Sequence, residues 1–257
     1  MTVDITPFDL LRWYLDAGAD EAIGEAAIDR FKAVSEVKRE APPPPPPAAK
    51  TAAPVSATAA HLADGCRTLA DLKAAMEAFD GLPLTRTATT TVFADGNPEA
   101  RLMVIGEAPG QEEDRAGRPF VGRSGILLNK MLASIGLERE RDVYITNVLA
   151  WRPLENRKPA PDEVAVCLPF LVRHIELIDP AMILLLGGAA ASAVLARNEG
   201  INRLRGQWHD FASPGLSHPV PVIASFHPAY LLRTPEAKRA AWKDLLMVKT
   251  RLDAKTP

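Results

Sequence analysis

The chain has 257 residues, of which 47% are hydrophobic, and a formal net charge of -2 at pH 7. This length predicts one sizeable domain, or one domain with an appendage, and the charge excludes a globally basic protein, so any nucleic-acid contact must rest on local positive charge. No apolar run approaches the roughly 18 residues of a membrane span, and the N-terminus lacks the pattern of a secretory signal. Cys66 and Cys167 are too few for a disulfide framework, so we expect a protein of the reducing cytoplasm with no membrane partner.

The first 62 residues differ in composition from the rest of the chain. Residues 1–40 carry apolar side chains at helical spacing, which predicts an N-terminal helical element. Residues 41–62 contain the polyproline run 42–47 followed by Ala, Thr, Pro and Ser, which is typical of a stiff linker without core-forming residues. We therefore expect one main domain over residues 63–257, with the helical element as an N-terminal extension.

The main domain alternates between strand and helix patterns. Apolar runs rich in branched residues predict four buried parallel strands, at 102–105, 143–146, 182–186 and 221–226. Helical periodicity predicts helices at 69–79, 126–135, 163–178, 189–196 and 238–252, while 95–98 predicts a turn and 152–161 a loop. This alternation predicts a three-layer α/β/α fold around a central four-stranded parallel sheet.

Three polar side chains directly follow predicted strands: Glu107 the first, Asn147 the second and His227 the fourth. The third strand ends instead in Gly187 and Gly188, which leave space. Because the carboxyl ends of parallel strands meet at one edge of a sheet, the three side chains can converge there. A carboxylate, an amide and an imidazole in one place can orient a water molecule and polarise a leaving oxygen. Taken singly, each also has a structural interpretation, as a loop carboxylate, a loop cap and a core histidine.

Four motifs occur in a fixed order around these residues. They are GEAPG at 106–110, GRPFVGRSG at 117–125, YITNVL at 144–149 followed by WRP and NR, and SFHPAYLLR at 225–233. In this order they resemble the uracil-DNA glycosylase superfamily, most of all family four, the bacterial and archaeal branch that usually carries an iron–sulfur cluster. The resemblance covers roughly residues 69–252 and leaves residues 1–60 outside it.

The resemblance implies a role for each matched residue. Three residues are implied to be catalytic: Glu107 positions water and stabilises the positive sugar, Asn147 reads the uracil edge, and His227 stabilises the departing uracil anion at O2. Phe120 is implied to stack on the flipped base. The implied uracil contacts are Gly106, Glu107, Ala108, Phe120, Asn147 and His227, and the implied DNA contacts are Gly110, Arg123, Ser124, Gly125, Arg157, Tyr230, Leu231, Leu232 and Arg233.

These roles agree with the chemistry of base excision. A base inside a duplex must be extruded into a pocket before its glycosidic bond is cleaved. The Asn147 amide can donate to uracil O4 and accept from N3–H, a pattern that cytosine does not match. Leu231 or Leu232 is expected to be the apolar wedge that fills the vacated stack. Basic residues that flank the motifs are expected to hold phosphates: Arg115, Arg118, Arg123, Arg152, Arg157, Lys158, Arg233, Lys238 and Arg239.

The sequence departs from family four at the positions that the resemblance assigns to the cluster cysteines. Phe79 and Leu82 occupy the CxxC positions, Trp151 occupies the third, and only Cys167 remains. A four-iron cluster needs four suitable ligands, usually thiolates. We therefore expect no metal and no cofactor, and an apolar plug in place of the cluster.

The predicted function is a DNA repair glycosylase that flips uracil out of DNA and hydrolyses its N-glycosidic bond. We expect it to be a monomer of the bacterial cytoplasm, associated with the nucleoid, with uracil-containing DNA and abasic DNA as partners and free uracil as product. The alternative is a non-catalytic protein that holds uracil or abasic DNA through the same pocket. A nucleotide-binding α/β enzyme is more remote, because the GxxxxGK[ST] phosphate loop is absent.

Overall fold

The computed structural model describes residues 52–254. The predicted helical element at 1–40 and the polyproline run lie outside the described residues. Within the described part, no helix is long and apolar enough to cross a membrane.

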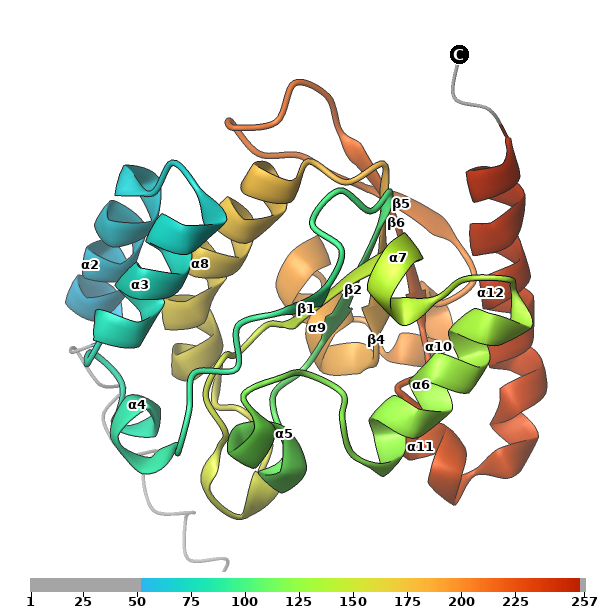
Figure 1. Cartoon of the computed structure of the whole chain (residues 1–257), viewed down its shortest axis with the longest axis horizontal. Helices are drawn as coiled ribbons and strands as arrows, with labels where there is room; N and C mark the ends of the chain where they lie inside the picture. Colours follow the sequence, from blue (N-terminus) through green and yellow to red (C-terminus); the bar gives the residue numbers. More distant parts are fainter. Residues whose placement is uncertain (1–51, 255–257) are drawn as a thin grey trace, which may run out of the picture. The chain divides into compact units, whose positions relative to one another are not determined.

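One sheet of six strands forms the centre of the described domain (Figure 1), in the order β1-β3-β2-β4-β6-β5. The four predicted strands are confirmed and are mutually parallel: β2 (Leu102–Gly106), β3 (Val143–Asn147), β4 (Met182–Leu186) and β6 (Val220–Ser225). Two antiparallel edge strands extend the predicted four-stranded sheet: β1 (Asp95–Gly96) on β3, and β5 (Trp208–Phe211) on β6. Both escape prediction because β1 is two residues long and β5 buries only Phe211, so neither has an apolar run.

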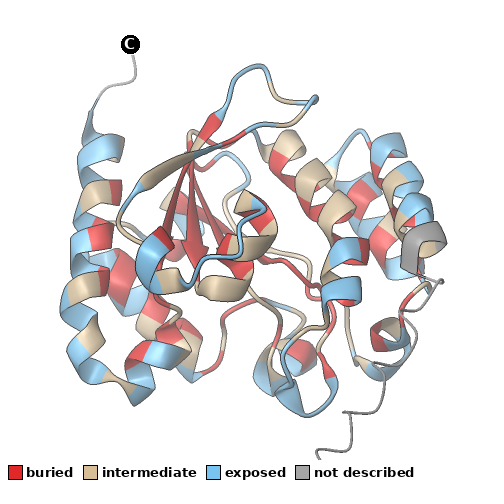
Figure 2. Cartoon of the chain, turned by 180° about the vertical axis from the view of Figure 1, so that it is seen from behind, coloured by how far each residue is buried: buried red, intermediate tan, exposed pale blue. Residues whose placement is uncertain are grey.

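Helices cover both faces of the sheet, as predicted for three layers. Alternate strand residues such as Met103 and Ile105 pack against α8 (Pro161–Ile178), α9 (Gly188–Leu195) and the elements beside them. Leu102 and Val104 face the opposite way, toward α6 (Arg123–Ser134) and α12 (Lys238–Asp253). The strands β2, β3 and β4 are buried throughout, between helices whose outer faces are exposed (Figure 2).

Helix α2 corrects the part of the predicted 41–62 linker that the structure describes, residues 52–62. It spans Ala52–Gly65 and packs along α8, and Ala59 and Ala63 are buried in that contact. Alanine has the highest helix propensity, and its small side chain lets two helices approach closely. The segment looked like a linker because it lacks large apolar side chains, but two of its alanines, Ala59 and Ala63, are themselves core residues. Figure 1 shows α2 beside α8, with α3 (Leu69–Ala78) next to them.

Short helices connect the main elements: α4 (Pro83–Thr87), α5 (Gln111–Ala116), α7 (Arg139–Asp142), α10 (Ile201–Leu204), α11 (Pro228–Arg233), and the 3-10 turns η2 (Leu154–Asn156) and η3 (Pro235–Ala237). Two of them bear on the site. Helix α5 directly follows the GEAPG motif, and α11 contains residues 230–233, which were expected to contact DNA.

The positions assigned to cluster cysteines lie in a buried apolar cluster. Phe79, Leu82, Trp151 and Cys167 are each less than 8% exposed. The Phe79 ring lies 6.0 Å from the Trp151 ring and 5.3 Å edge-on from the Phe170 ring. Burial raises the pKa of the Cys167 thiol, so that the thiol stays protonated and packs as a small apolar group.

Candidate active site

A cavity of about 780 Å³ lies at the carboxyl edge of the parallel sheet. Glu107, Asn147 and His227, which follow β2, end β3 and follow β6, all line it. Phe120, from the loop between α5 and α6, lines it as well. The structure therefore brings together the three side chains that were expected to converge, and adds an aromatic ring beside them.

Two glycines leave room for these groups. A Cβ on Gly106 would lie 2.4 Å from Asn147 Oδ1 and 2.5 Å from the Phe120 ring, so only glycine permits this approach. Gly187, after β4, has a φ of +95°, and a Cβ there would lie 3.1 Å from the His227 Cβ. The space predicted after the third strand is therefore confirmed, and His227 fills it.

The tautomer of His227 follows from its hydrogen bond. His227 is the N-cap residue of α11, and its Nδ1 accepts the backbone N–H of Ala229 at 3.1 Å. In neutral imidazole the other nitrogen then carries the proton, so Nε2–H is the donor. Burial, helped by the positive charge of Arg233, lowers the pKa of His227 to about 4. The ring is therefore a neutral donor at physiological pH.

Glu107 is half-buried in the cavity. Burial raises the pKa of its carboxyl group, and the positive charge of Lys158 opposes this shift. A partly desolvated carboxylate of this kind attracts positive charge more strongly than one in water does, and it accepts a proton more readily.

Phe120 adopts an unusual backbone conformation. Its φ is +51°, in the left-handed region, which costs a non-glycine residue on the order of 1–3 kcal/mol. Its ring is buried and lies 5.5 Å from the His227 ring at 31°. Strain of this kind persists only where surrounding contacts enforce it, and here it sets an aromatic face in the cavity wall.

Of the residues implied to contact DNA, some line the cavity and the others, Gly125, Leu231 and Leu232, do not. Those that line the cavity are Gly110, Arg123, Ser124, Arg157, Tyr230 and Arg233. Gly125 is buried in the first turn of α6 behind the cavity, and Leu231 is 1% exposed in the core under α11. Leu231 is therefore excluded as the wedge, because α11 is a helix and turns this position inward. Leu232 and Tyr230 remain accessible, at 37% and 38% exposure.

Arg157 is already paired. Its guanidinium donates to both carboxylate oxygens of Glu163, at 2.6 and 2.8 Å, and this pairing lowers the pKa of Glu163. Glu163 also accepts the backbone N–H of Ala160 at the start of α8. Arg157 therefore links the cavity wall to α8, and a phosphate at Arg157 has to compete with that carboxylate.

Sequence reasoning missed several residues of the site. The further lining residues are Pro109, Gln111, Glu112, Glu113, Gly122, Pro153, Asn156 and Ala229. Glu113 had a signal, because an acid three residues after Gly110 sits where a helix N-terminus is capped, and Glu113 accepts the Gly110 N–H. Arg139 had none: it lies in the charged stretch 138–142, typical of a solvated surface, yet it is 8% exposed.

The residues at the positions that the family resemblance assigns to cluster ligands do not fit an iron–sulfur cluster. Phenylalanine, leucine and tryptophan offer no thiolate, and Cys167 stands alone among them. Across residues 52–254, no three His, Cys, Asp or Glu side chains are grouped so that they could hold a metal ion.

Comparison with known proteins identifies the family of the chain. The model of the uracil DNA glycosylase superfamily matches residues 93–246, which include all four motifs. The chain is 42% identical over 171 residues to the type-4 uracil-DNA glycosylase of Thermotoga maritima, covering 65% of this chain and 86% of that protein. It is 45% identical over 159 residues to the type-4 enzyme of Archaeoglobus fulgidus, covering 60% and 78%. It is 31% identical over 149 residues to the type-5 uracil-DNA glycosylase of Thermus thermophilus, covering 51% and 66%. The family model covers more than half of the chain, and the chain belongs to the uracil-DNA glycosylase superfamily.

Proposed function

We propose that the cavity at the sheet edge is the active site at which this chain, as a uracil-DNA glycosylase, excises uracil from DNA and leaves an abasic site. One observation carries the proposal: Glu107, Asn147, His227 and Phe120 line a single cavity although they come from four separate segments. The curated relatives are named for this activity.

Base recognition rests on Phe120 and Asn147. A uracil extruded from the duplex stacks on the Phe120 ring, which the cavity presents beside His227. The Asn147 amide donates to O4 and accepts from N3–H. Cytosine presents a donor at position 4 and an unprotonated N3, so both contacts become mismatched.

Bond cleavage rests on His227 and Glu107. As the C1′–N1 bond breaks, its electron pair leaves with uracil and the sugar becomes oxocarbenium-like. The neutral His227 donates its Nε2–H to uracil O2, where negative charge develops. The Glu107 carboxylate stabilises the positive sugar and accepts a proton from the water that adds to C1′.

DNA is bound by residues at the rim of the cavity, which we define as Arg123, Leu232 and Arg233. Arg123 and Arg233 line it and are positioned to contact phosphates, and Leu232 is the accessible apolar wedge. We propose abasic DNA and free uracil as products and a monomer as the working form. We also propose the bacterial cytoplasm at the nucleoid as its location, since the substrate is DNA.

An excision assay tests the function against the non-catalytic alternative, which the named relatives do not favour. Excess protein is mixed with a duplex that contains one uracil, and the product is treated with alkali, which breaks the strand at abasic sites. Glycosylase activity gives a strand break and free uracil. Tight binding with neither product would support the alternative.

We further propose that the protein works without an iron–sulfur cluster, because the residues at the ligand positions cannot hold one. Protein purified anaerobically from iron-replete cells is expected to be colourless and to contain no stoichiometric iron. Charge-transfer absorption in the visible range, with about four irons per chain, would contradict this.

A further inference from the structure

The conformation of Phe120 depends on the two peptide groups that flank its Cα. One carries the Pro119 carbonyl, and the other carries the Phe120 carbonyl and the Val121 N–H. Because φ and ψ are the rotations that relate these two peptide planes, fixing both planes fixes the direction of the Phe120 side chain. At a φ of +51°, intrinsic preference does not hold the residue there, so other groups must.

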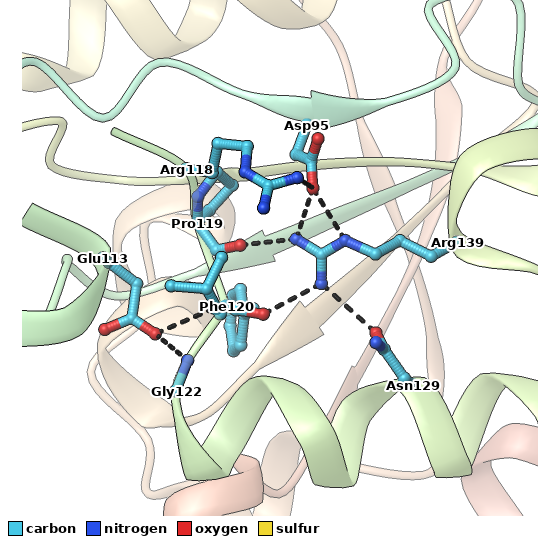
Figure 3. Close-up of polar contacts among 9 residues, drawn as sticks. Asp95, Glu113, Arg118, Pro119, Phe120, Gly122, Asn129 and Arg139 are labelled. Carbon is cyan, nitrogen blue, oxygen red and sulfur yellow. Dashed lines mark hydrogen bonds and ion pairs between the residues drawn. The ribbon is translucent and has the colours of Figure 1, made fainter. Parts of the chain in front are cut away.

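Arg139 contacts both planes (Figure 3) and is not among the residues that line the cavity. Its Nη1 donates to the Phe120 carbonyl at 2.9 Å, and its Nη2 donates to the Pro119 carbonyl. Nη1 also donates to Asn129 Oδ1 at 3.2 Å, and Nε and Nη2 lie 2.8 and 2.7 Å from Asp95 Oδ2. Every N–H donor of the guanidinium therefore has an acceptor, and Asp95 on β1 and Asn129 on α6 fix its orientation.

The far side of the same loop is held by other groups. Glu113 Oε1 accepts the backbone N–H groups of Val121 at 3.0 Å and Gly122 at 2.9 Å. The peptide plane after Phe120 is thus held at its carbonyl by Arg139 and at its N–H by Glu113. A Cβ on Gly125 would lie 1.8 Å from the Phe120 carbonyl oxygen, so α6 packs directly against that plane.

We propose that Arg139 is a positioning residue for base excision, which holds Phe120 in its left-handed conformation so that the ring meets the extruded uracil. The inference rests on the stacking role proposed above for Phe120. Arg139 does not line the cavity, so it touches neither uracil nor the reacting atoms. It acts by preorganising the wall of the site, which makes the geometry of the guanidinium more important than its charge.

Arg139→Lys separates geometry from charge. The ammonium group keeps the ion pair with Asp95, but its three donors cannot reproduce the planar fork to the Pro119 and Phe120 carbonyls. We expect the single-turnover excision rate constant to fall about 10- to 100-fold, as for a misplaced binding group. Affinity for an undamaged duplex should not change, since the rim is intact. Loss of folded protein would lower the reaction amplitude instead of the rate constant.

Arg141→Lys is the matched control. Arg141 lies in the same short helix, is 63% exposed and pairs with Glu138 and Asp142, outside the site. It should keep the wild-type rate constant. If Arg139→Lys does not fold, Asp95→Asn takes its place and the same criteria apply. It weakens the support of the guanidinium and leaves the loop backbone unchanged; its contact with the loop is the 4.0 Å ion pair with the Arg118 side chain, which is 62% exposed.

A double-mutant cycle with Phe120→Leu tests the mechanism. If Arg139 acts through the ring, Arg139→Lys should change the rate constant of Phe120→Leu by no more than about twofold. An equal loss in both backgrounds, or a wild-type rate for Arg139→Lys alone, would overturn the inference and leave the stacking role standing. A wild-type rate for Phe120→Leu would overturn the stacking role itself, and the inference with it.

Discussion

The cavity at the sheet edge and the apolar cluster around Phe79 differ in what they require of their side chains. In the cavity, hydrogen bonds orient the side chains. The His227 ring is oriented by the Ala229 N–H, and the Phe120 backbone is oriented by Arg139. In the cluster, the side chains share only burial and contact, and a phenylalanine, a leucine and a tryptophan fill it. The cavity needs particular atoms in particular places, whereas the cluster needs volume to be filled.

This difference predicts that the two regions tolerate substitution differently. Burying apolar area stabilises a fold with little dependence on which apolar residues supply it, provided the volume is filled. Transition-state stabilisation depends on donors aimed at developing charge, which few substitutions preserve. Substitutions in the cluster should therefore change mainly the free energy of unfolding, and substitutions in the cavity should change mainly the excision rate constant.

Phe79→Ala should have the largest effect. Removing a buried aromatic side chain that packs on Trp151 and Phe170 costs about 3–5 kcal/mol of unfolding free energy, measured by urea denaturation. The single-turnover excision rate constant of the folded fraction should stay at the wild-type value. Phe79→Leu, which keeps most of the volume, is the control and should cost less. A slower rate constant in Phe79→Ala would show that the cluster supports the site directly.

His227→Ala should show the opposite pattern. Losing a donor aimed at uracil O2 lowers the excision rate constant by about 100- to 1,000-fold. The urea midpoint should change far less than in Phe79→Ala. His218→Ala is the matched control, because His218 is exposed and lies outside the cavity. Wild-type excision by a folded His227→Ala protein would remove His227 from the mechanism.

Asn147→Asp tests the reading of the base. A carboxylate cannot donate to uracil O4, but it can accept from the cytosine amine, so uracil excision should drop about 10- to 100-fold. Cytosine excision should become detectable on an oligonucleotide with one target base. Asn198→Asp, an exposed amide away from the cavity, should behave as the wild type. If Asn147→Asp keeps both the wild-type rate and the wild-type choice of base, another residue reads the edge.

Lowering the pH should lower the free energy of unfolding, because of the buried His174 on the side of the sheet that carries the apolar cluster. Its Nε2 shares a 2.8 Å hydrogen bond with the Tyr144 hydroxyl, and burial lowers its pKa from 6.5 to about 3. Above pH 6.5 the ring is neutral whether folded or unfolded. As the pH falls below 6.5, the unfolded chain binds a proton that the folded chain does not, so stability is lost. Between pH 7.5 and 5 this costs about 2 kcal/mol, at 1.36 kcal/mol per pKa unit. Urea titrations at both pH values should show a smaller loss in His174→Gln.

Truncation should have the smallest effect when it spares α2. A chain that begins at Lys50 keeps every described element and should excise uracil at the wild-type rate. A chain that begins at Ala63 loses most of α2 and should unfold at lower urea, because Ala59 no longer covers α8. Equal stability of the two chains would restore the linker interpretation of residues 52–62. Lost excision with the longer chain would place residues 1–49 in the active unit.

Local patterns account for most of the fold. The four parallel strands and the five main helices follow from runs and periodicities within a few residues of each other, and all are present. The exceptions have local reasons as well. The strand β1 is too short to carry a hydrophobic pattern. Helix α11, which follows its N-cap residue His227, is only six residues long, too short to show helical periodicity. For this reason Leu231 was a candidate for the DNA wedge in the sequence, whereas in the structure its side chain is buried in the core.

By itself, the sequence determined the family, the α/β layering and the convergence of Glu107, Asn147 and His227, because strand ends and motif order are local properties. Only the tertiary structure decided how the site is held. Phe120 is held by Arg139, which lies 19 positions after it in the sequence. Arg139 is held in turn by Asp95, which lies 44 positions before Arg139. No local pattern marks a buried arginine in a charged stretch, since what buries it is the packing of segments distant in the chain.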